Sequence, residues 1–116
     1  MTIADITPRQ ALELLHDQLG LTETELSAAL DVSPRTLNRW KKAEAYPQHE
    51  ARNTLDELLE LVDVLNDLFD SPESARTWLR TNNSYLGGLT PVEAIRAGRI
   101  DRTRAAIDAL ESGIYL

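Results

Sequence analysis

Apolar residues recur along the chain at spacings of three and four positions, with polar residues between them. In the first such segment Leu12, Leu15 and Leu19 fall on one side of a helix with about 3.6 residues per turn. No segment shows the sustained alternation of apolar and polar residues that is typical of a half-buried strand. The pattern therefore predicts an all-α fold, with helices over residues 8–19, 23–30, 34–43, 50–69, 72–80, 91–97 and 102–112.

The starts of these predicted helices carry capping signals. A Ser or Thr followed by Pro suits a helix start, because the hydroxyl accepts a hydrogen bond from a free amide of the first turn and Pro has no amide to satisfy. This pair occurs at Thr7-Pro8, Ser33-Pro34, Ser71-Pro72 and Thr90-Pro91. A Gln or Glu three residues after the cap completes a capping box. We expect such boxes at Thr7–Gln10, Thr22–Glu25 and Thr90–Glu93, and we expect Asp101 to cap the last helix.

The segment 50–69 is the longest of the predicted helices and has a broad apolar surface. Its main stripe consists of Leu55, Leu58, Leu59, Val62, Leu65 and Phe69, and Leu61, Val64 and Leu68 widen it. A surface this broad should contact more than one neighbour. We expect this surface to serve partly as the core of this chain and partly as the contact of a homodimer, with the core alone as the alternative. A short linker over residues 44–48 divides the chain into regions 1–46 and 47–116, which we expect to pack together.

Residues 26–40 have the pattern of a helix-turn-helix, in which two short helices cross through a tight turn. Ser27 or Ala28 is small enough for the point where the helices touch. Asp31 stands where this turn often has Gly, and Asp enters the left-handed region more readily than most residues. The apolar residues that we expect to hold the crossing are Leu26, Leu30, Val32, Leu37 and Trp40.

The second helix of this motif has a cationic face within an acidic chain. The chain has 19 acidic and 12 basic residues and a net charge of −7, whereas residues 33–42 include four basic residues and no acidic one. Arg and Asn read base edges, and Arg and Lys neutralise phosphates. We therefore predict a DNA-binding face at Ser33, Arg35, Thr36, Asn38, Arg39, Lys41 and Lys42. Of these, Arg35, Thr36 and Asn38 should reach bases. An ordinary helical hairpin with a solvated basic face is the alternative.

The composition argues against an enzyme and against a metal site. The chain has no cysteine, and His16 and His49 are not spaced as a pair of metal ligands. A glycine-rich phosphate loop is also absent from the sequence. We predict no catalytic residue, no metal and no cofactor.

Neither membrane insertion nor export is predicted. No apolar run reaches the roughly 18 to 20 residues of a membrane helix, and residues 1–5 lack the basic and apolar regions of a signal peptide. We therefore expect a cytoplasmic protein without a membrane partner.

The C-terminal part combines glycine stops with apolar residues. Residues 88–98 read Gly-Leu-Thr-Pro-Val-Glu-Ala-Ile-Arg-Ala-Gly, and residues 110–116 read Leu-Glu-Ser-Gly-Ile-Tyr-Leu. Gly113 should end the last helix, which leaves Ile114, Tyr115 and Leu116 as an apolar tail. Such a tail must either pack on its own domain or insert into a partner.

With these motifs the chain resembles the Xre/MbcA/ParS-like antitoxins, the partners of RES-domain toxins. The resemblance covers the N-terminal helix-turn-helix, the central segment around Trp78 and the C-terminal glycine pattern. It implies an Xre-like helix-turn-helix followed by a C-terminal helical toxin-binding region. In this family the C-terminal region covers the active site of an NAD-degrading toxin, and the antitoxin or its complex represses its own promoter.

The resemblance also implies partners and contact residues. The partners are a cognate RES-domain toxin and operator DNA, in a homodimer or a larger toxin–antitoxin hetero-oligomer. The toxin-contacting residues that it implies are Arg99, Arg102, Gly113, Ile114, Tyr115 and Leu116. Two other functions stay open, a stand-alone helix-turn-helix transcriptional regulator with a C-terminal dimerisation region, and a protein-interaction module that no longer binds DNA.

Overall fold

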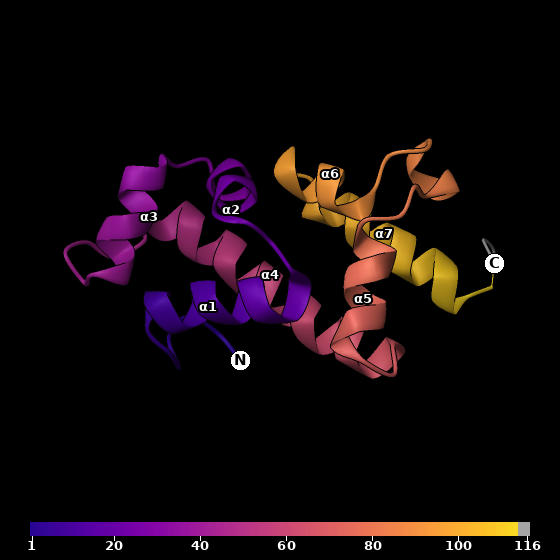
Figure 1. The fold of residues 1–116 in the computed structure, drawn as a ribbon, viewed down its shortest axis with the longest axis horizontal. Coiled ribbons are helices and arrows are strands. Elements are labelled where there is room, and N and C mark those ends of the chain that lie inside the picture. The colour runs from indigo at the N-terminus through magenta and orange to yellow at the C-terminus, as the bar shows by residue number, and fades with distance from the viewer. Residues whose placement is uncertain (114–116) are drawn as a thin grey trace.

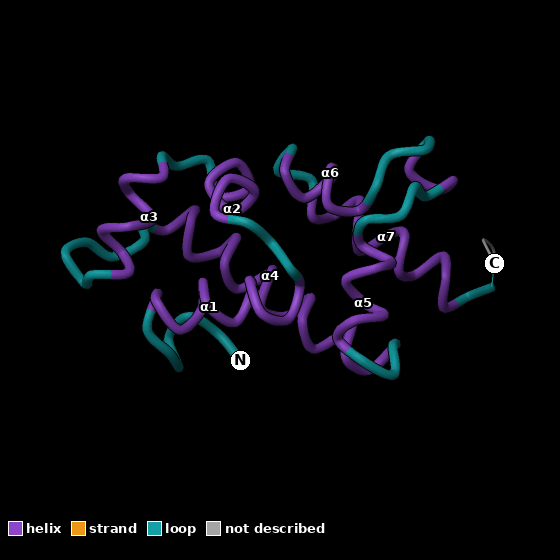
Figure 2. The backbone as a smooth tube through the Cα atoms, viewed as in Figure 1, coloured by secondary structure: helices purple, strands orange, loops and turns teal. Residues whose placement is uncertain are grey.

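The computed structural model describes residues 1–113, so the tail residues Ile114, Tyr115 and Leu116 lie outside the described residues. Over the described range the chain forms helices and no strand, which confirms the all-α prediction (Figure 1, Figure 2). The α-helices are α1 (Pro8–Leu19), α2 (Glu23–Leu30), α3 (Pro34–Lys41), α4 (His49–Leu68), α5 (Pro72–Leu79), α6 (Pro91–Arg96) and α7 (Ile100–Glu111). A short 3-10 helix, η1 (Ser84–Leu86), lies in the loop between α5 and α6, where no helix was predicted.

Most helices start where the capping signals predict. The three predicted capping boxes, at Thr7, Thr22 and Thr90, are all formed. In each box the threonine hydroxyl accepts the amide three residues later at 3.1 Å. The caps therefore fix these starts locally, before any tertiary contact is considered.

The start of α7 contradicts the prediction. The helix begins at Ile100, and Asp101 lies inside it rather than capping it. The cap position belongs to Arg99, whose side chain makes no capping hydrogen bond. Ile100 is 4% exposed, so packing of this side chain sets the start.

Several predicted ends are also wrong by one or two residues. The helices α4, α5, α6 and α7 each end one residue earlier than predicted, and α3 ends at Lys41. Ala43, predicted to be helical, has φ of 59° and lies in the loop that follows α3. A residue in the left-handed region cannot continue a right-handed helix.

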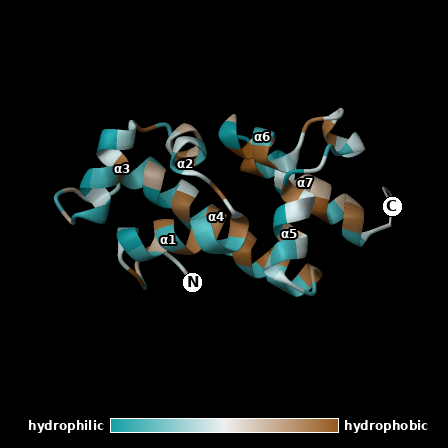
Figure 3. Cartoon of the chain, in the orientation of Figure 1, coloured by the Kyte–Doolittle hydropathy of each residue, from teal (hydrophilic) through white to brown (hydrophobic). Residues whose placement is uncertain are grey.

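The long helix α4 runs through the centre of the molecule. It contacts α1, α2, α5 and α7, and hydrophobic and hydrophilic residues are interspersed along it (Figure 3). The buried residues of its stripe are Leu55, Leu58, Leu59, Leu61, Val62 and Leu65. The stripe therefore builds the core of this chain. A part of the α4 surface in a homodimer contact stays a prediction.

Two arginines join the C-terminal half to the turn between α1 and α2. The Arg80 guanidinium donates to both carboxylate oxygens of Glu25, at 2.9 and 2.7 Å, and to the carbonyl of Gly20 at 2.7 Å. Arg76 donates to the carbonyl of Asp17 at 2.8 Å. Together with the packing of α2 on α6 and of α1 on α5, these bonds make the two halves one packed body.

The body is elongated, with extents of 45 × 24 × 22 Å. The helix α3 lies at one end, and the C-terminal end of α7 lies at the other (Figure 1). Among the described residues no helix combines the length and the apolarity needed to cross a membrane.

Candidate functional site

The helices α2 and α3 form the predicted helix-turn-helix crossing. Asp31 ends α2 in the left-handed region, with φ of 54° and ψ of 47°. The Asp31 amide donates to the carbonyl of Ala28 at 3.2 Å, and the Val32 amide donates to that of Ser27 at 3.0 Å. Asp31 therefore accepts the geometry that this turn usually assigns to Gly. Ser27 is the small residue that the packing buries, whereas Ala28 is exposed.

The apolar residues predicted to hold the crossing do so. Leu26, Leu37 and Trp40 are each at most 4% exposed, Leu30 is 5% exposed, and Val32 packs against the same core. Trp40 is thus an anchor of the core rather than a side chain free to stack on bases.

The start of α3 is held by its own side chains. The Ser33 hydroxyl accepts the Thr36 amide at 3.1 Å and lies 3.1 Å from the Thr36 hydroxyl. These two residues, both predicted to bind DNA, are therefore fixed in place at the N-terminal end of the helix. Thr36 is half-buried, and Ser33 is exposed.

The cationic face of α3 is open to solvent. Arg35, Asn38, Arg39 and Lys42 are exposed. Over residues 1–113 no hydrogen bond or ion pair engages the guanidinium of Arg35 or Arg39, or the ammonium of Lys42. The helix therefore presents two arginines and an asparagine, the residue types that read base edges, beside a free lysine.

Lys41 differs from these residues. Its ammonium forms an ion pair with Glu23, the first residue of α2, and its side chain is 29% exposed. Sequence reasoning placed Lys41 on the open face and missed this contact, because the two residues are 18 positions apart.

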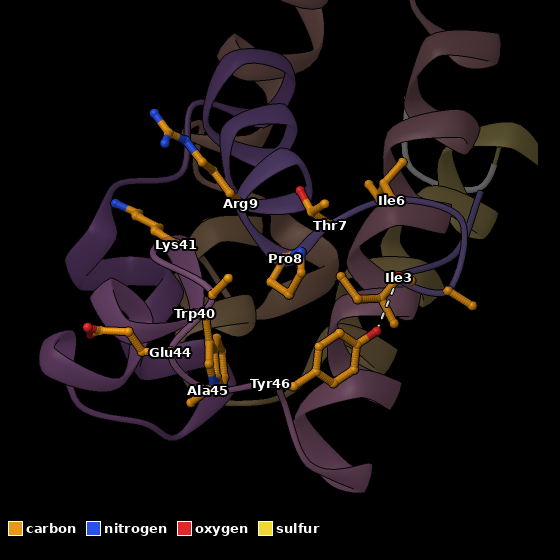
Figure 4. A pocket seen from close by; sticks show the side chains of 12 residues that line it. Ile3, Ile6, Thr7, Pro8, Arg9, Trp40, Lys41, Glu44, Ala45 and Tyr46 are labelled. Carbon is orange, nitrogen blue, oxygen red and sulfur yellow. Dashed lines mark hydrogen bonds between the residues drawn. The ribbon is translucent and has the colours of Figure 1, made fainter.

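An open groove lies beside α3, between the N-terminal segment and the loop that joins α3 to α4 (Figure 4). Its volume is about 750 Å³. Trp40 and Tyr46 contribute aromatic surface, and Arg9 and Lys41 lie near one another at one edge (Figure 4). The groove collects no set of catalytic groups. Among residues 1–113 no cluster of three or more His, Asp or Glu side chains could hold a metal ion.

The C-terminal helices enclose a smaller hollow with an apolar floor. Its volume is about 240 Å³, and Leu86 and Ala94 are its buried lining residues. Leu89, beside them, is 50% exposed. Arg99 and Arg102, both predicted to contact a toxin, line the same hollow and are exposed.

Arg99 is not free in this structure. Its guanidinium donates to the two carboxylate oxygens of Asp101 at 3.0 and 2.9 Å, which lowers the pKa of the Asp101 carboxyl. Gly113, predicted to stop the last helix, follows the C-cap residue Ser112 and has φ of 77°. The structure therefore brings Arg99 and Arg102 together at one hollow and leaves Gly113 at the far end of α7.

Comparisons with known proteins match two separate parts of the chain. The family model described as the antitoxin Xre-like helix-turn-helix domain matches residues 3–50. The model described as the antitoxin Xre/MbcA/ParS C-terminal toxin-binding domain matches residues 64–113. The mycobacterial cidal antitoxin MbcA of Mycobacterium tuberculosis is 31% identical over 100 residues, which cover 86% of this chain and 88% of MbcA.

The chain belongs to the Xre/MbcA/ParS antitoxin family. It is thus an antitoxin of a toxin–antitoxin system, and family membership favours this function over a stand-alone regulator. A probable mycobacterial cidal antitoxin of M. tuberculosis is a further relative, 29% identical over 97 residues, which cover 84% of this chain and 82% of the relative.

A solved structure shares the fold of this antitoxin. One chain of the crystal structure of the M. tuberculosis MbcT–MbcA toxin–antitoxin complex matches with a TM-score of 0.67 and 29% identity, over 93% of this chain and 96% of that one. The Xre/MbcA/ParS resemblance expected from the sequence is therefore confirmed in both sequence and fold.

Proposed function

We propose that this antitoxin neutralises a cognate RES-domain, NAD-degrading toxin by covering the toxin's active site, and that it represses its own operon by binding promoter DNA. Residues 1–46 would bind the DNA and residues 47–116 the toxin. The toxin-binding description of the family model over residues 64–113 supports the first activity. The open cationic face of α3 supports the second.

The proposed toxin-binding surface lies at the end of the molecule that is far from α3 (Figure 1). Gly113 ends α7 there, and the apolar residues Ile114, Tyr115 and Leu116 follow it in the sequence. An apolar segment after a glycine stop suits insertion into a cleft, because burial of its side chains removes apolar surface from water. Arg99 and Arg102, at the opposite end of α7, would contact the toxin through a second patch.

The proposed DNA-binding surface is the exposed side of α3. Arg35, Thr36 and Asn38 lie toward the N-terminal end, the part of a recognition helix that contacts base edges in the major groove. Arg39, Lys41 and Lys42 lie toward the C-terminal end and would meet phosphates. The Ser33 cap would approach a phosphate at the positive, N-terminal end of α3.

Truncation tests the toxin-binding proposal. Removal of residues 114–116 should abolish rescue from the co-expressed toxin, measured as colony formation after induction. The truncated chain should keep its melting temperature and its affinity for operator DNA, because it retains all of the described fold. Full rescue by the truncated chain would contradict the proposal.

Two matched arginine substitutions test the DNA-binding proposal. Arg39→Ala should weaken binding to operator DNA and flatten its salt dependence by about one unit in the slope of log K against log salt concentration. Arg96→Ala is the control, because Arg96 is also an exposed arginine in the last turn of a short helix, α6. Equal behaviour of the two variants in a fluorescence anisotropy titration would count against a role of α3 in DNA binding.

A further inference from the structure

Lys41 is less open to solvent than the other basic residues of α3, because its side chain is 29% exposed and paired to Glu23. Its side chain lines a hollow of about 270 Å³ between α1 and α2, where Leu12 and Leu26 supply apolar surface. A lysine stem packs well on such a surface while its ammonium stays near water. The ammonium then meets the carboxylate of Glu23, whose side chain is 66% exposed.

The carboxylate of Glu23 is stabilised by its position in the helix, but it would repel a DNA phosphate. Glu23 is the first residue of α2, where the positive end of the helix dipole stabilises a carboxylate. The motif that carries the cationic face of α3 thus also carries a carboxylate at the start of its other helix. A phosphate that approached Lys41 would therefore meet the charge of Glu23 as well.

An exposed ion pair of this kind is easily exchanged. Such pairs contribute little to stability, since water screens both charges and two long side chains lose freedom. A DNA phosphate offers Lys41 the same charge that Glu23 offers, and it also releases a counterion from the duplex. Glu23 and a DNA phosphate therefore compete for Lys41, and loss of the Glu23–Lys41 pair should hardly change the stability of the fold.

We propose that Glu23 is an intramolecular competitor for DNA phosphate, which holds Lys41 and so limits affinity for duplex DNA of any sequence. Discrimination is then left to the base-facing residues Arg35 and Asn38, because neither is paired to a carboxylate in residues 1–113. The proposal rests on the DNA-binding function proposed above and adds a residue that sets the overall affinity for DNA.

The direct test is Glu23→Gln in the full chain, titrated with a fluorescent duplex of scrambled sequence between 50 and 200 mM salt. Release of Lys41 should steepen the slope of log K against log salt concentration by about 0.9 and raise affinity by up to about eightfold near 0.1 M salt. Operator DNA should gain no more than the scrambled duplex, so the ratio of the two affinities should not rise. The matched control is Glu60→Gln, because Glu60 is 63% exposed and is paired to Arg104.

A double-mutant cycle separates competition for Lys41 from simple repulsion. In a Lys41→Gln background the effect of Glu23→Gln should fall to the level of the Glu60→Gln control. A gain that persists undiminished in that background would show that Glu23 only repels the duplex, and it would overturn the proposal. Equal gains from Glu23→Gln and Glu60→Gln would overturn it as well.

The outcomes also distinguish this inference from the function on which it rests. If Arg39→Ala weakens binding while Glu23→Gln matches its control, the DNA-binding proposal stands and the competition fails. If neither the wild-type chain nor Glu23→Gln binds a duplex at 50 mM salt, both fail. Melting temperatures within about 2 °C of wild type verify that each variant is folded, as expected for exposed substitutions.

Discussion

Glu23 and Glu25 lie two residues apart on the first turn of α2, and each holds a cation from another part of the chain. The Glu25 side chain is 11% exposed and receives two hydrogen bonds from Arg80, whereas the Glu23 side chain is 66% exposed and meets Lys41. Removal of one partner from a buried pair leaves a charge without compensation, while an exposed charge returns to water. Because Glu25 is mostly buried, its pair with Arg80 holds the two halves together. Because Glu23 is exposed, Lys41 can exchange it for another partner.

The largest expected effect tests this contrast directly. Arg80→Ala should lower the free energy of unfolding by about 2 kcal/mol, less than for a fully buried pair because Arg80 is 44% exposed. Lys41→Ala should lower it by less than about 0.5 kcal/mol. Urea denaturation of both variants measures the difference. Similar losses would show that burial does not separate the two pairs.

A somewhat smaller loss of stability is expected from a substitution at Gly20, in the turn between α1 and α2. Gly20 has φ of 69°, and a Cβ there would lie 2.9 Å from Cδ of Arg76. Gly20→Ala should therefore cost about 1.5 kcal/mol, the backbone strain of the left-handed region plus displacement of Arg76.

Gly98→Ala is the control for this substitution. Gly98 has φ of 77°, and a Cβ there would meet nothing within 4 Å, so backbone strain alone should cost about 1 kcal/mol. Thermal unfolding of both variants provides the comparison. Equal losses for the two variants would mean that Arg76 adjusts at no cost.

Acid should remove part of what the Arg80–Glu25 pair contributes to the free energy of unfolding. The hydrogen bonds from Arg80, aided by the Thr22 amide, hold the pKa of the Glu25 carboxyl below its usual range. A carboxyl with a lowered pKa stabilises the fold above its unfolded pKa of about 4.3, and this stabilisation is lost as the pH falls through the folded value. The stability gap between wild type and Arg80→Ala should therefore narrow below about pH 4. A constant gap from pH 7 to pH 3 would exclude this linkage.

The smallest expected effect has the opposite sign. The Ser27 hydroxyl is buried and has no hydrogen-bond partner within the described residues. Ser27→Ala should therefore raise the free energy of unfolding by about 0.5 kcal/mol, since an unpaired polar group is removed from the interior. Ser71→Ala should instead lower it by about 1 kcal/mol, because Ser71 caps α5. A loss in both variants would indicate that Ser27 is paired through water.

Features set by neighbouring residues were predictable from the sequence. Threonine caps and their boxes act over three residues, so Thr7, Thr22 and Thr90 marked three helix starts correctly. The left-handed turn at Asp31 and the cationic face of α3 are local in the same sense. The start of α7 was missed because burial of Ile100, a tertiary effect, outweighed the capping tendency of Asp101.

The ion pairs that Glu23 and Glu25 form with distant residues could not be predicted from the sequence. Glu25 and Arg80 are 55 residues apart, and no local pattern relates them. Lys41 had the same basic character as its neighbours in the sequence, and only the fold shows that it turns toward Glu23. The base and phosphate roles assigned to individual α3 residues stay predictions.

The 20 residues of α4 also set a spacing between the two ends of the body. A helix of this size is about 30 Å long and turns by about 100° per residue. A single inserted residue would therefore swing everything beyond it by more than a quarter turn and pull α1 and α5 out of register on its surface. A change of residue count within α4 should therefore disrupt this packing, whereas surface loops tolerate insertions and deletions.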